Sequence, residues 1–138
     1  MSNSQLVRPH KRIGVGVIRH SKVNKILVSR RLRKGDMGGL WEFPGGKMET
    51  NETVGECIRR EIKEELGIEV LVKEHLVTID HQYPNFGVTL FVHHCQHVGG
   101  VPRALESEEI SWVTLDELTQ LQFPEANYKI IALLEQLG

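Results

Sequence analysis

The sequence predicts a mixed α/β (α+β) fold in which one β-sheet lies sandwiched between α-helices. Three observations support this: short apolar segments typical of strands, an amphipathic segment at residues 54–66, and an apolar helical pattern near the C-terminus. All three fall within 138 residues, a length that suits one domain. We therefore expect residues 1–138 to form a single domain with helices packed on the sheet.

The strand candidates are bounded by turn residues. Residues 13–18 and 26–29 flank a polar turn and predict a hairpin. A basic, glycine-rich loop follows at residues 30–39, and residues 40–43 predict a short strand that ends at the Pro44-Gly45-Gly46 turn. Further strands are expected at residues 70–80, 87–98 and 110–113.

The main helix has a start signal and a stop signal. Thr53 with Glu56 three residues later forms a capping box, in which each side chain satisfies a free backbone N–H of the first turn. The helix should end at Leu66, because Gly67 can adopt the left-handed conformation that a helix C-terminus favours.

Two more helices are predicted in the C-terminal part of the chain. Thr114 with Glu117 forms a second capping box, which opens a short helix. A last helix is expected from about residue 125 to residue 137, where apolar residues recur with helical spacing.

Composition excludes several classes of protein. With 25% charged residues and a net charge of −1, nothing favours binding to polymeric nucleic acid or to a membrane surface. Cys57 and Cys95 form no CxxC pair, which argues against a disulfide scaffold and favours a reducing compartment. Residues 1–12 lack the apolar stretch of a secretory signal, and no apolar run approaches the roughly 20 residues of a membrane helix. We therefore expect a cytoplasmic protein.

Three glutamates of the main helix fall close to its apolar stripe. That stripe consists of Val54, Ile58, Ile62 and Leu66. At about 100° per residue, Glu65 projects inside the stripe and Glu61 lies at its edge. Glu64 lies about 60° further round, and Arg60 is expected on the solvated side.

Inward-facing carboxylates need a compensating charge. Burying one costs several kcal/mol unless it is paired or bound to a metal, and clustered like charges raise that cost. Arg60 can pair with Glu64 or Glu56 at i,i+4, but it is expected to face outward. A hard cation is therefore favoured, because Mg²⁺ or Mn²⁺ takes oxygen ligands and bridges substrate phosphates.

Residues 46–68 resemble the Nudix box at every fixed position. The matching residues read Gly46-x5-Glu52-x7-Arg60-Glu61-Ile62-Lys63-Glu64-Glu65-Leu66-Gly67-Ile68. Residues 41–47 are similar to the entry of that box, and the resemblance covers nearly the whole chain. The fold of this family is a mixed sheet between helices, in agreement with the predicted elements.

The resemblance implies hydrolysis of a nucleoside diphosphate linked to another group, with Mg²⁺ as cofactor and Mn²⁺ as an alternative. By position, Glu61, Glu64 and Glu65 resemble the metal ligands, together with the carbonyl of Gly45. Glu61 serves either as a ligand or as the general base that takes a proton from water. Arg60 resembles the residue that orients the glutamates. Glu52 and Gly67 are expected to be structural.

Segments outside the box resemble the MutT branch of the family, which hydrolyses 8-oxo-dGTP and so prevents mutations. Arg31 matches a substrate-contacting arginine, and Glu106 matches a loop glutamate that joins the metal site as ligand or base. Residues 123–127 resemble the segment that reads the oxidised guanine through Asn127, whose amide both donates and accepts. The remaining substrate-binding candidates are Glu42, Phe43, Pro44 and Gly45.

Each of these assignments has a structural alternative. Asn127 can instead cap the last helix, and Arg31 can be an exposed loop charge. The role of Glu106 can belong to a glutamate two or three residues further on. Asp36 departs from the family pattern, because it stands where a neutral ring contacts the substrate.

The sequence also allows other substrates, a binding role without catalysis and a zinc site. Pro84 stands where both ADP-ribose hydrolases and MutT-like chains have a proline. Residues 39–43 resemble the entry segment of enzymes that cleave CTP and modified pyrimidine nucleotides. A nucleotide-binding module without catalysis is disfavoured, because all the box glutamates are present. A zinc site at His93, Cys95 and His97 lacks a fourth ligand, and a half-buried sheet face is the preferred interpretation. The expected partner is a small nucleotide, and we expect a monomer, with a dimer as the alternative.

Overall fold

A computed structural model describes residues 8–138. The prediction that residues 1–12 are no secretory signal falls mostly outside the described residues. The elements, in chain order, are β1 (His10–Arg19), β2 (Ile26–Arg30), β3 (Trp41–Glu42), β4 (Gly45–Lys47), α1 (Val54–Leu66), β5 (Glu69–Gln82), β6 (Gly87–Gly99), β7 (Glu109–Val113), α2 (Leu115–Leu118), the 3₁₀ turn η2 (Glu125–Asn127) and α3 (Tyr128–Leu137).

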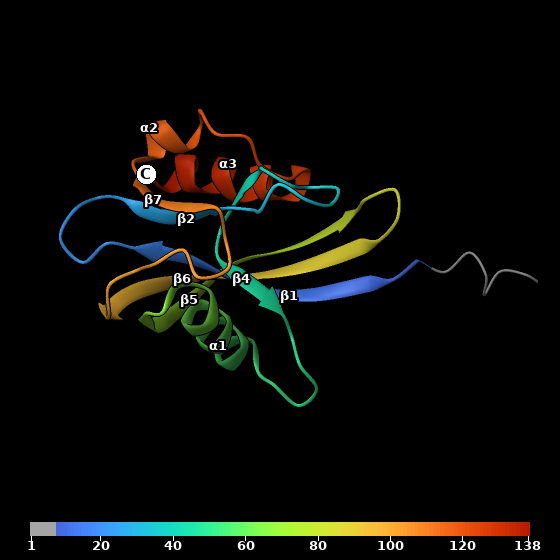
Figure 1. The fold of residues 1–138 in the computed structure, drawn as a ribbon, viewed down its shortest axis with the longest axis horizontal. Coiled ribbons are helices and arrows are strands. Elements are labelled where there is room, and N and C mark those ends of the chain that lie inside the picture. Colours follow the sequence, from blue (N-terminus) through green and yellow to red (C-terminus); the bar gives the residue numbers. More distant parts are fainter. Residues whose placement is uncertain (1–7) are drawn as a thin grey trace, which may run out of the picture.

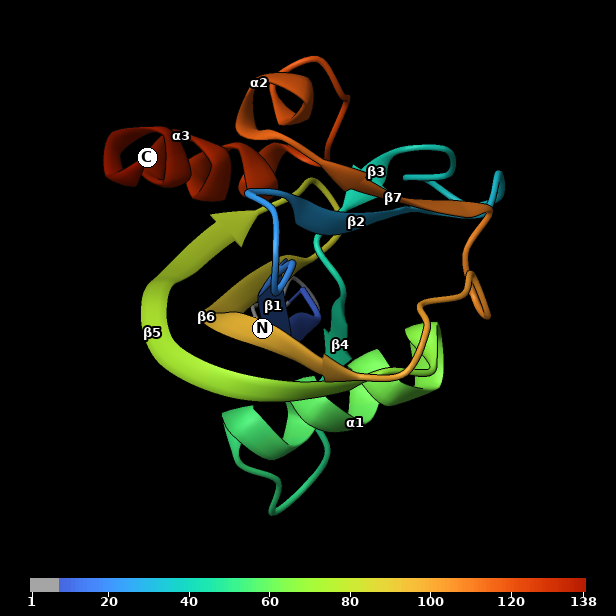
Figure 2. The same cartoon turned by 90° about the vertical axis from the view of Figure 1, so that its left-hand side faces the viewer.

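One seven-stranded mixed sheet forms the centre of the molecule (Figure 1). Its main order is β3-β2-β1-β6-β5, with β4 paired to β1 and β7 paired to β2. β1 and β6 are parallel, whereas β1 and β2 form the predicted antiparallel hairpin. Figure 2 shows α1 on one side of the sheet and α2 with α3 on the other. The predicted sandwich of a mixed sheet between helices is confirmed.

Apolar side chains form a separate core on each side of the sheet. Under α1, Ile58, Ile62 and Leu66 are fully buried against strand residues such as Ile18 and Leu27. The core on the other side is larger, and the buried face of α3 closes it. The residues that α3 buries there are Ile130, Ile131 and Leu134.

The two capping boxes are confirmed. Thr53 accepts a hydrogen bond from the Glu56 backbone, and Glu56 accepts one from the Thr53 backbone, so both free donors are satisfied. α1 ends at Leu66, and Gly67 follows in the left-handed region at a φ of 70°. The reciprocal pair of bonds between Thr114 and Glu117 opens α2.

Two expectations about element bounds need correction. The short strand β3 ends before Pro44 as expected, but Gly45–Lys47 forms β4 against β1 in place of a turn. The last helix begins at Tyr128, and residues 125–127 form a 3₁₀ turn closed by the Asn127 N–H and the Pro124 carbonyl. Proline at the start of that turn favours such a tight beginning. Within residues 8–138, no helix is long and apolar enough to span a membrane.

Candidate active site

α1 presents two of its three box glutamates inward and the third at the rim. Glu61 keeps only 16% of its side chain exposed, and Glu65 is half-buried. Glu65 accepts a hydrogen bond from the backbone N–H of Gly45 at 3.0 Å, which ties α1 to β4. Glu64 is 50% exposed at the rim. The inward direction predicted for Glu61 and Glu65 is therefore confirmed.

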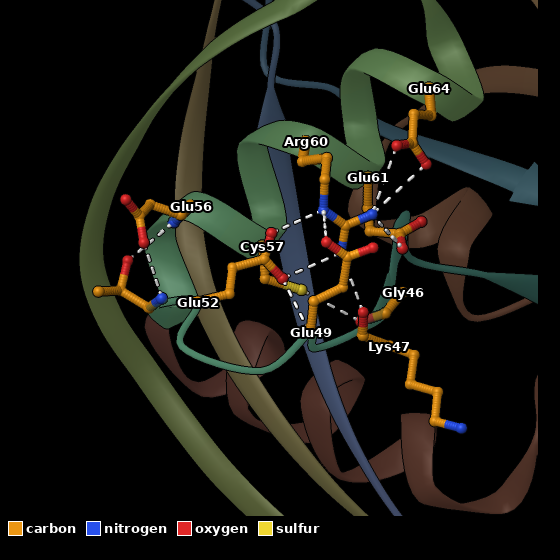
Figure 3. A network of polar contacts seen from close by, with 10 residues as sticks. Gly46, Lys47, Glu49, Glu52, Glu56, Cys57, Arg60, Glu61 and Glu64 are labelled. Atoms are coloured by element: carbon orange, nitrogen blue, oxygen red, sulfur yellow. Dashed lines mark hydrogen bonds and ion pairs between the residues drawn. The ribbon is translucent and has the colours of Figure 1, made fainter.

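Arg60 lies at the centre of a polar network (Figure 3). Its Nε and Nη2 donate to the two carboxylate oxygens of Glu52 at 2.6 and 3.0 Å, a bidentate pair. Its Nη1 donates to Glu61 at 3.0 Å and to Glu64 at 3.4 Å, and Nη2 also donates to the carbonyl of Lys47 at 3.0 Å. Arg60 thus orients two of the box glutamates.

The expectation that Arg60 faces solvent is wrong. Only 24% of its side chain is exposed, because the loop before α1 folds back over the helix and brings Glu52 and Glu49 against the guanidinium. The predicted i,i+4 pair with Glu64 is confirmed, whereas Glu56 is occupied by the Thr53 cap. A helical projection treats the helix in isolation, so it does not show what the loop covers.

Gly46 permits the close approach of β4 to α1. A Cβ at this position would collide with the carboxylate of Glu61. One turn before Glu61 on the same helix, the Sγ of Cys57 donates to the Gly46 carbonyl at 3.3 Å. Gly46 is therefore needed so that the Glu61 carboxylate can lie against β4.

The carboxylates of the site fall into two electrostatic groups. The hydrogen bond from Arg60 lowers the pKa of Glu52 to about 2. Burial is the main reason that the pKa of Glu65 rises to about 8, and the nearby charge of Glu42 raises it further, although the Gly45 N–H acts in the opposite direction. Burial likewise raises the pKa of Glu42 and of Glu61, partly offset by Arg31 and Arg60 respectively.

Glu106 belongs to the same group as Glu65. It lies on the loop before β7 and lines a hollow of about 230 Å³ together with Glu42 and Glu65. Its negative charge contributes to the raised pKa of Glu65. The next two glutamates in the chain, Glu108 on the loop and Glu109 at the start of β7, pair with Arg33 and Arg30. Of these three glutamates, Glu106 is therefore the one that faces the site.

The donor set of this hollow suits a hard divalent cation. The negative charges of Glu42, Glu61 and Glu106 lie close enough to Glu65 to raise its pKa. Oxygen ligands of this kind are those that Mg²⁺ binds. Within residues 8–138, no three acidic, histidine or cysteine side chains already converge as a ready-made metal cluster, and Arg60 and the Gly45 N–H engage Glu61 and Glu65.

A cavity of about 140 Å³ adjoins this acidic hollow. Arg31 and Glu42 line both spaces, and their side chains form an ion pair at 3.0 Å. Arg31 is thus an exposed loop charge, with 44% of its side chain accessible, but it is paired with Glu42 and borders both spaces. The apolar walls of the cavity are Ile13, Val15, Met37, Phe43, Phe86, Val88, Leu90, Pro124 and Ala126.

Asn127 lines this cavity, and it makes no side-chain bond that caps α3. The alternative that Asn127 merely caps the last helix is therefore wrong. Two phenol oxygens fix the segment that carries it: Tyr128 accepts the Phe123 N–H and Tyr83 accepts the Ala126 N–H, each at 3.0 Å. The amide of Asn127 thus stands on a rigid turn at the cavity wall.

The other substrate-binding candidates differ in position. Phe43 is buried, lines the cavity and stacks on Phe123 with ring centroids 5.5 Å apart. Gly45 also lines the cavity. Pro44 is buried outside the lining, where its carbonyl accepts the Gly16 N–H. Asp36 is exposed and does not line the cavity, and its neighbour Met37 does so instead.

The residues of the zinc alternative have structural roles. The Cys95 side chain packs in the core under α1, and burial raises the pKa of its thiol to about 12. His93 and His97 form hydrogen bonds with the backbone carbonyls of Lys73 and Gly100. Both cysteines are free and buried. These contacts agree with the half-buried sheet face preferred from the sequence.

Sequence reasoning missed several residues of the cavity, among them one cation and two aromatic residues. Lys11, Tyr83 and Phe86 line it from β1 and from the turn between β5 and β6. For Lys11 a signal existed, because side chains two apart on a strand share a face and residues 11, 13 and 15 alternate accordingly. Tyr83 and Phe86 lie far from the box in sequence, and no local pattern links them to it.

Comparison with known proteins identifies the family. The profile of the NUDIX domain matches residues 14–133. The 8-oxo-dGTP diphosphatase of Escherichia coli K12 is 34% identical over 125 residues, which cover 91% of this chain and 96% of that protein. The CTP pyrophosphohydrolase of the same strain is 35% identical over 102 residues, 74% of each chain. The solution structure of the E. coli ORF135 protein has a TM-score of 0.79 at 27% identity, over 94% of this chain and 91% of that one.

These matches define the class of the protein: the chain belongs to the Nudix family. It is a hydrolase, with 8-oxo-dGTP diphosphatases among its homologues. A nucleotide-binding module without catalysis is therefore not supported. Enzymes of this family act on small nucleotides and generally use divalent metal ions.

Proposed function

We propose that this hydrolase cleaves oxidised purine nucleoside triphosphates in a Mg²⁺-dependent reaction, converting 8-oxo-dGTP and water to 8-oxo-dGMP and diphosphate. Removal of such nucleotides from the precursor pool prevents mutations. The observation that carries the proposal is that Asn127, whose side-chain amide forms no capping bond, lines a cavity adjoining the acidic hollow. An amide can pair with the donor and acceptor edge of an oxidised guanine.

The acidic residues have the cofactor role in this proposal. Glu61, Glu64, Glu65 and Glu106, with the carbonyl of Gly45, would hold Mg²⁺ or Mn²⁺. When bound, such an ion neutralises phosphate oxygens and makes water a better nucleophile near neutral pH.

The remaining polar groups orient and transfer protons. Arg31, which lies between the cavity and the hollow, would bind the phosphate chain, while Glu42 and Phe43 border the base. Glu61 or Glu106 would accept the proton of the attacking water. Arg60 is a positioning residue, because its bonds to Glu61 and Glu64 set their direction.

A panel of nucleotides tests the proposal. We expect kcat/KM in the presence of Mg²⁺ to be highest for 8-oxo-dGTP among 8-oxo-dGTP, dGTP, CTP and ADP-ribose, with the monophosphate and diphosphate as products. Chelation with EDTA should abolish the activity, and Mg²⁺ or Mn²⁺ should restore it. Much faster turnover of CTP or ADP-ribose would show that the substrate assignment is wrong.

Pyrimidine nucleotides are the second candidate substrate. The CTP pyrophosphohydrolase relative matches this chain at 35% identity over 102 residues, against 34% over 125 residues for the 8-oxo-dGTP diphosphatase of the same strain. The same panel distinguishes the two. We further propose that the protein acts as a single-domain, cytoplasmic monomer, with a dimer as the alternative that sedimentation would reveal.

A further inference from the structure

Lys11 lies on the face of β1 that lines the cavity. Side chains alternate along a strand, so Lys11 shares this face with Ile13 and Val15. Arg12 projects to the other face, where its guanidinium lies 4.8 Å from the centre of the Phe91 ring. The strand thus presents one cation to the cavity and one to the opposite side.

A ring contact holds the ammonium of Lys11 in place, but among the described residues its N–H donors have no hydrogen-bond acceptor. Its Nζ lies 4.3 Å from the centre of the Phe86 ring, a cation–π contact that fixes its position. Lys11 is half-buried, and within residues 8–138 its ammonium forms no hydrogen bond or ion pair. An ammonium has three N–H donors, and a ring face leaves most of them free. A half-buried donor of this kind fits a ligand that carries an acceptor.

We infer that Lys11 is a specificity-determining residue, whose ammonium donates to a carbonyl oxygen of the bound nucleobase. This inference rests on the proposed function. Lys11 lines only the cavity, whereas Arg31 lines both the cavity and the acidic hollow, where the phosphates are expected. The base of 8-oxo-dGTP carries two carbonyl oxygens, one on each ring. Lys11 and Asn127 reach the same cavity from separate elements and are thus able to contact two sites on one base.

The test compares a base that has carbonyl oxygens with one that has none. Lys11→Met keeps the apolar stem and removes the donor, and dATP offers no carbonyl oxygen on its base. We expect kcat/KM for 8-oxo-dGTP to fall by roughly 10- to 100-fold, as for the loss of a charged hydrogen bond, and kcat/KM for dATP to change less than about threefold. Lys11→Arg should retain most of the activity.

Arg12→Met is the matched control, because it removes the neighbouring cation from the other face of the same strand. It should leave the ratio of the two kcat/KM values unchanged. Melting curves of both variants establish that the fold persists. An equal loss of kcat/KM for 8-oxo-dGTP and dATP would place Lys11 at the phosphates, and no loss for either substrate would show that it does not contact the base. Either result overturns the inference.

Binding of the monophosphates separates this inference from the proposed function. Calorimetry without divalent metal compares 8-oxo-dGMP with dAMP, and Lys11→Met should weaken only the former. If the wild-type protein prefers CTP instead, the proposed function fails, and CTP, whose base has one carbonyl oxygen, takes the place of 8-oxo-dGTP in the comparison. The selective loss is expected there too, and its absence overturns the role of Lys11.

Discussion

Two groups of carboxylates in this site show opposite electrostatics. In the network around Arg60, Glu52 receives a bidentate pair of hydrogen bonds and its pKa falls to about 2. In the hollow beside it, Glu65 has one backbone N–H as its partner and the charges of Glu42 and Glu106 nearby, so its pKa rises to about 8. A glutamate is therefore structural in one group and a candidate cation ligand in the other, and the difference lies in the hydrogen-bond donors and charges around it.

Removing the charge of Glu65 should have the largest effect on activity. Glu65→Gln keeps the shape and the hydrogen bond from Gly45, but it removes a negative charge from the acidic hollow. We expect kcat to fall by roughly 100- to 1,000-fold, the size of effect seen when one electrostatic contact to a transition state is lost.

The control for this variant is Glu135→Gln, an equivalent change at an exposed position of α3. It should have wild-type kcat in the same steady-state assay. Near-normal activity of a folded Glu65→Gln variant would contradict a ligand role, and with it the division into two groups.

Asn127→Ala should have the next largest effect, on substrate selection. Because Asn127 makes no capping bond, its amide is free to pair with the base. We expect KM for 8-oxo-dGTP to rise by about tenfold, corresponding to roughly 1.4 kcal/mol, and KM for dGTP to rise less. Measuring KM for both nucleotides decides the matter, since an equal rise would mean that Asn127 does not distinguish the oxidised base.

Local patterns predicted much of this molecule. The capping boxes at Thr53 and Thr114, the stop at Gly67 and the inward direction of Glu61 and Glu65 each depend on residues within a few positions of one another. Such interactions are set by helical geometry, which a sequence displays directly.

Long-range packing could not be predicted in the same way. Arg60 is covered by a loop, Lys11 contacts Phe86 in the turn between β5 and β6, and Tyr83 holds a turn 43 residues away. The contacts of Lys11 and Tyr83 depend on how β1, β5 and β6 are ordered in the sheet, and residue spacing does not encode that order. The resemblance to the Nudix box supplied ligand candidates, but the hydrogen bonds from Arg60 to Glu52 and to the Lys47 carbonyl became visible only in the fold.

A smaller effect concerns stability. The folded protein keeps a proton on Glu65 up to a pKa of about 8, whereas the unfolded chain loses it near the usual 4.5. Unfolding is therefore increasingly favoured as the pH rises through this window, and the protein loses stability. Without divalent metal at pH 8.5, Glu65→Gln should melt roughly 3–6 °C above the wild type if about 1 kcal/mol is regained.

Two further measurements sharpen this result. At pH 5 the difference between variant and wild type should shrink, and Mg²⁺ should raise the melting temperature of the wild type more than that of the variant. A variant that melts below the wild type at both pH values would show that burial of the charge carries no such cost.

The smallest expected effect is the loss of stability at acidic pH that comes from the pair of Glu52 and Arg60. The folded pKa of Glu52 is about 2 and its usual value is 4.5, so its pairing with Arg60 stabilises the fold above pH 4.5, and this contribution is lost as the pH falls toward 2. Glu52→Gln lacks this dependence. We therefore expect the variant to melt lower than the wild type at pH 6, and the gap to narrow steadily at pH 4 and pH 3. A gap that stays constant across these pH values would mean that the Glu52 carboxylate contributes no charge to the network, and the contrast between the two groups would then reduce to burial alone.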